Sequence, residues 1–142
     1  ALISGLDKYN NIFMMADSKV SAIPAVRAFL FDLQKKIARE NDIIMDGRDI
    51  GTVVLPDADL KIFLTASPEA RADRRYAELK DKPDAPAYEQ VLADIIKRDH
   101  DDSTRAIAPL KQADDAVLCD TTELSLEESV DTIIGMIRGI KK

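Results

Sequence analysis

Apolar residues recur along the chain in two patterns, one typical of helices and one of buried strands. Spacings of three and four predict an amphipathic helix over Ser21–Glu40, with Pro24 in the first turn, where its missing N–H leaves no hydrogen bond unmade. The same spacing predicts a helix from about Tyr88 to Asp99 or beyond, and the charged segment before it, Lys80–Ala87, is typical of a mobile loop. Ser125–Glu128 has the Ser-x-x-Glu spacing of a capping box and precedes a further helical pattern.

Three short apolar runs predict buried strands: Ile43–Met45, Leu60–Leu64 and Ala116–Cys119. After the second run, Ser67 can cap a helix whose first position is Pro68. Strands that alternate with helices pair in parallel through helical crossovers. The sequence therefore predicts an α/β fold with a parallel sheet flanked by helices, in which ligands bind at the carboxyl ends of the strands.

Length and composition favour a single domain over residues 1–142. The chain is 46% hydrophobic and 32% charged, with five Gly and six Pro, which argues against the disordered and low-complexity classes. Its apolar runs are far shorter than the roughly 20 residues that cross a bilayer, so we expect no membrane association. A single cysteine, Cys119, and a single histidine, His100, argue against an internal disulfide and a Cys/His metal site, and we expect a reducing, cytoplasmic location.

The net charge of −6 argues against binding to a nucleic acid backbone, so recognition of phosphate has to rely on local arginines. The first candidate is the turn Asp46-Gly47-Arg48-Asp49, in which Gly47 is free to take a backbone angle that other residues avoid. As a plain polar turn, its charges would pair with one another. As a site, Arg48 would hold an anionic oxygen through two hydrogen bonds, and a carboxylate would accept hydrogen bonds from a ligand.

Three arginines in the predicted helix after Pro68 form a second candidate: Arg71, Arg74 and Arg75. Their i, i+3, i+4 spacing places them on one side of the helix. They form either a solvated face balanced by neighbouring acidic residues or a cationic clamp on a phosphate chain.

A third candidate lies in the predicted helix around His100. Arg98, Asp102 and Arg105 point the same way if the helix continues past this histidine. They form either a surface ladder of ion pairs, each contributing ~0.5 kcal/mol, or a site in which Asp102 binds a ribose diol and the arginines bind base or phosphate. His100 itself faces another side, and we interpret it as a solvated side chain.

One unbroken stretch, IMDGRDIGTVVLP at residues 44–56, is far more specific than these separate candidates. It is accompanied by SKVSAIPAVR at 18–27, KIFL at 61–64, EARADRR at 69–75 and the segment from Arg98 to Leu110. Together these segments resemble the bacterial cytidylate kinases, the CMP/dCMP members of the nucleoside monophosphate kinases. The resemblance runs from about Asp17 to the C-terminus.

The resemblance implies a role for each candidate residue. Four residues would surround the cytosine base: Ser18, Arg27, Asp49 and Arg105. Two would hold the sugar: Arg98 and Asp102. Arg48 would meet the monophosphate. A lid that closes on the transferring phosphates would carry three arginines: Arg71, Arg74 and Arg75.

The resemblance also implies the reaction, transfer of the γ-phosphoryl group of ATP, with Mg²⁺, to CMP or dCMP. Arg48 and the lid arginines would act by positioning the phosphates and by cancelling their charge. Cytosine offers an amine donor and two acceptors, and uracil reverses this pattern at two positions, so a site built for one base leaves polar groups unpaired with the other. We expect a monomer with small nucleotides as partners. The alternatives are a noncatalytic nucleotide-binding module and a kinase for another monophosphate, such as UMP or AMP.

Kinases of this class carry a G-x-x-x-x-G-K-[ST] loop that cradles the phosphates of ATP. This sequence has no such motif, and residues 1–16 show no convincing match to the family. Three explanations stay open. The chain is part of a longer kinase that is inactive without the loop; or Ala1–Ser4 forms a substitute strand in a module that binds without turnover; or the missing strand comes from another chain.

Overall fold

The computed structural model describes residues 23–140, which fall into two compact units that divide between Ile44 and Met45. The first unit contains α2 (Pro24–Glu40). Pro24 lies at its start, and after its end the side-chain amide of Asn41 donates to the carbonyl of Ile37 at 3.1 Å. This confirms the predicted helix from Pro24 onward, while its predicted first residue, Ser21, lies outside the described residues.

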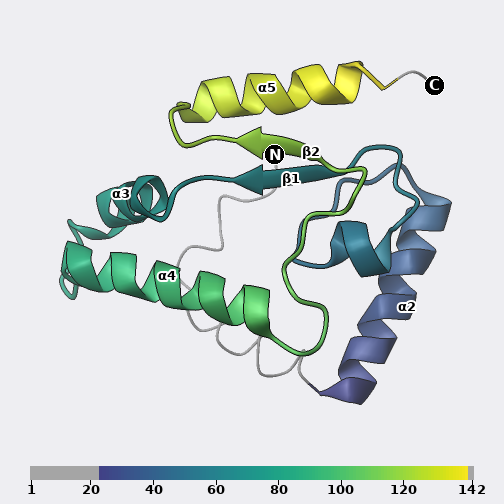
Figure 1. Cartoon of the computed structure of the whole chain (residues 1–142), viewed down its shortest axis with the longest axis horizontal. Coiled ribbons are helices and arrows are strands. Elements are labelled where there is room, and N and C mark those ends of the chain that lie inside the picture. Colours follow the sequence, from purple (N-terminus) through teal and green to yellow (C-terminus); the bar gives the residue numbers. More distant parts are fainter. Residues whose placement is uncertain (1–22, 141–142) are drawn as a thin grey trace. The chain divides into compact units, whose positions relative to one another are not determined.

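The second unit is built on two parallel strands, β1 (Ile62–Thr65) and β2 (Val117–Asp120). Ile62 pairs with Val117 and Thr65 with Asp120, so both strands end at the same edge. Figure 1 shows both arrows pointing the same way, with two helices in the crossover between them. These are α3 (Pro68–Leu79) and α4 (Tyr88–Thr104), and they pack on each other. The predicted parallel α/β arrangement is therefore confirmed.

Two further elements flank the sheet strands in the sequence. A single π-helical turn, η1 (Ile50–Val54), precedes β1, and helix α5 (Leu126–Arg138) follows β2. Gly47, just before η1, has φ of +157°, and a Cβ atom there would lie 2.8 Å from Cγ1 of Ile50. The turn therefore requires glycine at this position, in agreement with the prediction from the sequence.

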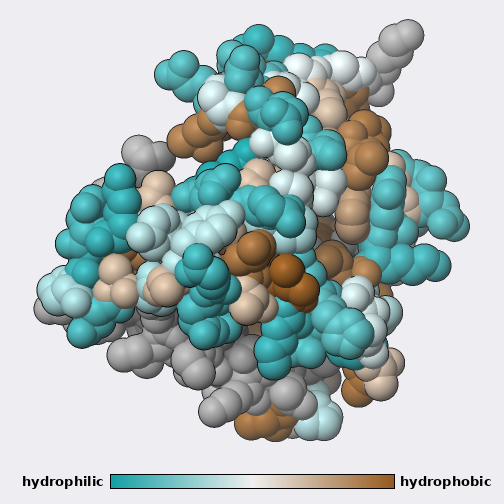
Figure 2. All heavy atoms as spheres, turned by 60° about the vertical axis from the view of Figure 1, so that its left-hand side comes forward, coloured by the Kyte–Doolittle hydropathy of each residue, from teal (hydrophilic) through white to brown (hydrophobic). Residues whose placement is uncertain are grey.

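Few side chains of the described residues are buried. The buried apolar residues are small or medium in size: Val54, Ala66, Ala72, Val91 and Cys119. Larger apolar side chains reach the surface, as the brown atoms in Figure 2 show. In β2 only Cys119 is buried, and Leu118 is 55% exposed, so the prediction of a strand here is right and the prediction that it is buried throughout is wrong.

The predicted strand Ile43–Met45 is not formed. These residues have no regular secondary structure, and Ile44 is 90% exposed. A strand exists only where a neighbour takes up its N–H and C=O groups, and the sheet of the described residues contains β1 and β2 alone. Apolar composition predicted the strand, but the partner that would order it is not among the described elements.

The predicted starts of α3 and α5 are confirmed. The hydroxyl of Ser67 accepts from the backbone N–H of Ala70 at 3.1 Å, with Pro68 in the first turn of α3. At α5 the capping box is complete: Ser125 Oγ accepts from the N–H of Glu128 at 3.2 Å, and Glu128 Oε2 accepts from the N–H of Ser125 at 2.8 Å. The loop expected over residues 80–87 does separate α3 from α4. None of the described helices is of a length and apolarity that would cross a lipid bilayer.

Replacing Ser125 by alanine is expected to lower the free energy of unfolding by about 1 kcal/mol, because the N–H of Glu128 loses its cap. Urea denaturation followed by circular dichroism measures the loss. Ser129→Ala is the matched control, since its hydroxyl donates to the carbonyl of Ser125 and caps no backbone N–H. An equal loss in both variants would contradict the capping argument.

Candidate functional site

A hollow of about 540 Å³ opens at the carboxyl ends of the strands, where the fold class places ligands. It is lined by the ends of β1, the first turns of α3, the last turns of α4 and Thr121 after β2. We call it the arginine hollow, because Arg71 and Arg74 from α3 both line it, opposite Asp99 and His100 from α4. Its charged lining therefore combines two guanidinium groups with one carboxylate.

Arg71 is held by two partners at once. Its Nη1 and Nη2 donate to the two oxygens of Asp99 at 2.8 and 2.5 Å, and its Nε donates to the carbonyl of Ala66 at 3.0 Å. The hydrogen bond from Arg71 holds the pKa of Asp99 below its usual value, and the same bond raises the pKa of Arg71. Both groups therefore stay ionised at neutral pH.

The other two arginines of α3 take different partners. Arg74 donates to the carbonyls of Thr121 and, at 3.2 Å, Leu124, and its Nη1 donates to the hydroxyl of Thr121 at 3.3 Å. Arg75 pairs with Glu78 at 2.9 Å along the helix. The shared spacing of the three arginines thus brings Arg71 and Arg74 to one hollow, whereas Arg75 is not among the residues that line it.

A second cluster joins residues far apart in the sequence: Arg48, Asp102 and Arg105. Nε of Arg48 donates to Oδ2 of Asp102 at 2.6 Å, across 54 residues. Nη1 of Arg105 lies 3.9 Å from Oδ1 of the same carboxylate. The side chain of Asp102 is only 19% exposed, so one half-buried carboxylate is shared by two guanidinium groups. We call this group the Arg48 cluster.

Arg105 departs from the predicted geometry. Helix α4 ends at Thr104, so Arg105 is the first residue beyond it, and its Nε donates to the carbonyl of Ala108 at 2.5 Å. Ala108 has φ of +49°, a left-handed conformation that a non-glycine residue adopts only when its surroundings hold it. Nη2 of Arg105 is buried and has no hydrogen-bond partner among the described residues, which is uncommon for a buried donor.

The predicted ladder of Arg98, Asp102 and Arg105 on one helix face is only partly formed. Asp102 takes Arg48 from a distant loop as its short-range partner, while Arg98 is exposed. Arg98 instead helps to lower the pKa of Asp99, as does Arg48. The arginine hollow and the Arg48 cluster are therefore electrostatic neighbours on α4.

The structure gives less information on the other predicted site residues. Asp49 lies at the start of η1, where its carbonyl accepts from the N–H of Val53 at 2.8 Å. Ser18 lies outside the described residues, and Arg27 belongs to α2 with its side chain outside the description. Their proposed places around the base stay predictions.

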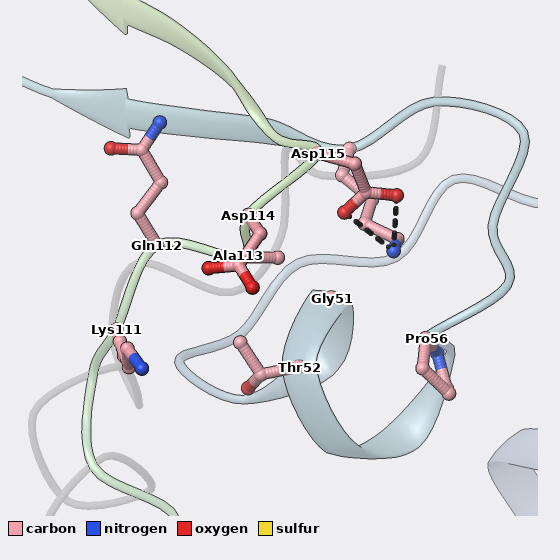
Figure 3. Close-up of a pocket in the computed structure, with 9 residues that line it drawn as sticks. Gly51, Thr52, Pro56, Lys111, Gln112, Ala113, Asp114 and Asp115 are labelled. Atoms are coloured by element: carbon pink, nitrogen blue, oxygen red, sulfur yellow. Dashed lines mark hydrogen bonds and ion pairs between the residues drawn. The ribbon is translucent and has the colours of Figure 1, made fainter.

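A smaller hollow of about 300 Å³ lies near the start of β1 (Figure 3). Its main feature is the ion pair of Lys61, which donates to both oxygens of Asp115 at 2.8 and 2.7 Å. The hydrogen bond from Lys61 lowers the pKa of Asp115. Lys111 and Asp114 add one charge of each sign to the lining. The two positive and two negative side chains of the lining balance in charge, so we interpret this hollow as a structural contact between segments.

Sequence reasoning missed Asp99 and assigned His100 to solvent. Both line the arginine hollow. Asp99 stands 28 residues from its partner Arg71, so no helical spacing connects the two, and only the packing of α3 on α4 brings them together. The prediction that His100 is exposed is confirmed, but His100 is also one of the residues that line the arginine hollow.

Comparison with known proteins places these residues in a family. A family model described as "Cytidylate kinase" matches residues 9–139. The chain belongs to the cytidylate kinase family. The match starts eight residues before Asp17, so likeness to the family reaches further toward the N-terminus than the sequence motifs indicated.

Relatives named cytidylate kinase are about half identical to the chain. The protein of Carboxydothermus hydrogenoformans is 52% identical over 120 residues, which cover 84% of this chain and 54% of that protein. The protein of Azorhizobium caulinodans is 53% identical over 123 residues, covering 86% of this chain and 60% of that protein. The protein of Thermosipho melanesiensis is 51% identical over 121 residues, covering 85% and 56%. The chain thus spans little more than half the length of these family members.

Proposed function

We propose that the chain carries the CMP-binding and phosphate-clamping residues of an enzyme that transfers the γ-phosphoryl group of ATP to CMP or dCMP. The observation that carries this proposal is the Arg48 cluster. Arg48 and Asp102 come together across 54 residues at 2.6 Å, and Nη2 of Arg105 is buried without a partner in the part of the chain that the structure describes. A cluster that keeps an unpaired donor is suited to a ligand that supplies the acceptor. Membership of the cytidylate kinase family supports the choice of substrate.

In this proposal each side chain of the Arg48 cluster has one task. Arg48 holds an oxygen of the monophosphate and so aligns the attacking phosphate. Asp102 accepts hydrogen bonds from the sugar hydroxyls, with Arg98 beside it. Arg105 turns its unpaired N–H to the base, where cytosine offers the acceptors O2 and N3. Asp49, with Ser18 and Arg27, completes the surroundings of the base.

The lid arginines Arg71, Arg74 and Arg75 act on the phosphoryl group in transfer. Their guanidinium groups offset the charge that spreads over its oxygens, and the reaction needs no covalent enzyme intermediate. Arg71 and Arg74 already line one hollow. Arg75 has to exchange Glu78 for the phosphates, which an exposed ion pair of this kind permits at low cost.

The described residues contain no group of three or more His, Cys, Asp or Glu side chains arranged to hold a metal ion, so we assign magnesium no residue and no step here. ATP as donor, CMP or dCMP as acceptor, a monomeric state and a cytoplasmic location belong to the proposal.

The proposal is tested by the melting temperature of the 142-residue chain with CMP, UMP and AMP at equal concentrations. A ligand that binds only the folded state raises the melting temperature, by an amount equivalent to about 2.7 kcal/mol at 100 times its Kd. We expect CMP to raise it clearly more than UMP or AMP. Equal stabilisation by UMP would refute the selection of cytosine, and no stabilisation by CMP would refute the site.

A noncatalytic nucleotide-binding module is the second candidate; it would keep the contacts with CMP and would transfer no phosphoryl group. A coupled assay of ADP production by the purified chain separates catalysis from binding. CMP-dependent ADP production shows that these 142 residues suffice for turnover. CMP binding without turnover fits both the module and a part of a longer kinase.

A further inference from the structure

We propose that Asp99 is a positioning residue for phosphate binding, because it fixes the direction in which the Arg71 guanidinium faces the arginine hollow. The inference rests on the proposed function, in which Arg71 meets a phosphate chain. Asp99 had no role in the sequence-based site, and its partner lies on another helix, 28 residues away.

The geometry of Arg71 leaves donors for a ligand. A guanidinium group carries five N–H donors in a fixed plane. Arg71 uses one on the carbonyl of Ala66 and two on the oxygens of Asp99. Two N–H groups, one on each Nη atom, are left over in this arrangement. A guanidinium held along two edges keeps one plane, so its remaining donors keep one orientation, and Arg71 is among the residues that line the hollow.

Exposure indicates that the pair orients the arginine and adds little stability. The side chains of Arg71 and Asp99 are 34% and 39% exposed. Ion pairs that are this exposed to solvent contribute little to the free energy of folding. The two parallel hydrogen bonds, by contrast, fix the plane of the guanidinium group even when their net contribution to folding is small. Asp99 therefore contributes mainly by orienting the guanidinium group of Arg71.

Helix α4 repeats this arrangement one turn later. Asp102, three residues after Asp99, pairs with Arg48, which belongs to the other cluster. Two carboxylates on one side of α4 thus each hold an arginine from a different segment, Arg71 from α3 and Arg48 from the loop before η1. The charge of Arg48 also lowers the pKa of Asp99, so the two pairs lie close enough to interact. Helix α4 sets the relative positions of the two arginines.

The test uses inorganic tripolyphosphate as the probe and calorimetry on the 142-residue chain. Asp99→Asn keeps the size of the side chain and removes its charge, and we expect tripolyphosphate to bind about tenfold more weakly, the equivalent of one charge-assisted hydrogen bond. Asp101→Asn is the matched control, because it changes the same chemistry on the same helix in an exposed pair with Lys97. We expect its affinity to stay within about twofold of the parent chain.

A spectroscopic readout separates orientation from simple neutralisation. In the parent chain the Nε–H of Arg71 donates to Ala66, so its NMR signal is expected to exchange slowly with water. Asp99→Asn should shift this signal and speed its exchange. Asp99→Glu keeps the charge but displaces the carboxylate by one methylene, and it should shift the signal and weaken binding by less than Asp99→Asn does. This variant also serves if Asp99→Asn does not fold.

Several results would overturn the proposal. Tighter or unchanged tripolyphosphate binding in Asp99→Asn would show that the carboxylate only competes with the anion. An Asp99→Glu chain that matches the parent in affinity and in the Arg71 signal would show that the geometry is not set by Asp99. No binding of tripolyphosphate by the parent chain would remove Arg71 from phosphate recognition.

One result separates this proposal from the proposed function. If the parent chain does not bind CMP, but Asp99→Asn lowers its affinity for tripolyphosphate, the proposed function is refuted and the role of Asp99 stands.

Discussion

Replacing Arg48 by alanine is expected to weaken CMP binding by about 3 kcal/mol, or roughly 100-fold, the upper range for hydrogen bonds to a charged group. Two effects add up in this variant. The monophosphate loses its charge-assisted hydrogen bonds, and Asp102 loses its partner at 2.6 Å and repels the approaching anion. Calorimetric titration of CMP into the 142-residue chain measures the change.

Arg138→Ala is the matched control for Arg48→Ala, because Arg138 is an exposed arginine in the last turn of α5. Its CMP affinity should equal that of the parent chain. Arg48→Lys keeps the positive charge but loses the planar fork of donors, so we expect an intermediate affinity. An Arg48→Ala chain that is folded and binds CMP as the parent chain does would remove Arg48 from the site.

Replacing Asp102 by asparagine is expected to weaken CMP binding by about 2 kcal/mol, since the sugar hydroxyls lose a charged acceptor. The substitution also leaves Arg48 and Arg105 facing each other without the carboxylate that they share. Two guanidinium groups without a counter-ion repel each other, so the free energy of unfolding should fall as well. Urea denaturation measures this loss, and titration with CMP measures the loss of binding.

Binding of inorganic phosphate separates the two effects of Asp102→Asn. Phosphate lacks a sugar, so its affinity should fall by less than that of CMP in this variant. Asp94→Asn, on the same helix and paired with Gln90, is the control and should change neither affinity. Equal losses for CMP and phosphate would show that Asp102 acts only by holding the arginines.

The local elements of this protein follow from local sequence signals. Ser67 and Pro68 start α3, the capping box at Ser125 starts α5, and Gly47 takes the one backbone angle that its turn requires. Each of these depends on atoms within a few residues of one another, so spacing alone suffices to predict them. The same reasoning failed for Ile43–Met45, because a strand depends on a neighbour that its own residues do not encode.

The candidate site likewise combines features that the sequence predicts with features that depend on tertiary packing. Motifs around Arg48 and around Asp102 could each be interpreted as a plain ion-paired surface, and only the family likeness suggested that they meet. The structure brings these two residues together in a hydrogen bond, whereas the predicted pairing along the helix from Arg98 to Asp102 is replaced by it. Asp99 could not be found, because its partner Arg71 belongs to another helix.

The sequence by itself determined the α/β class, the starts of α3, α4 and α5, the family and the candidate residues of a phosphate site. Only the tertiary structure decided which arginine each carboxylate holds: Asp99 takes Arg71, and Asp102 takes Arg48. The physical reason is the separation along the chain between the groups that interact. Helix caps and turns are set by hydrogen bonds between near neighbours in the chain, whereas an ion pair across 28 or 54 residues depends on how whole elements pack.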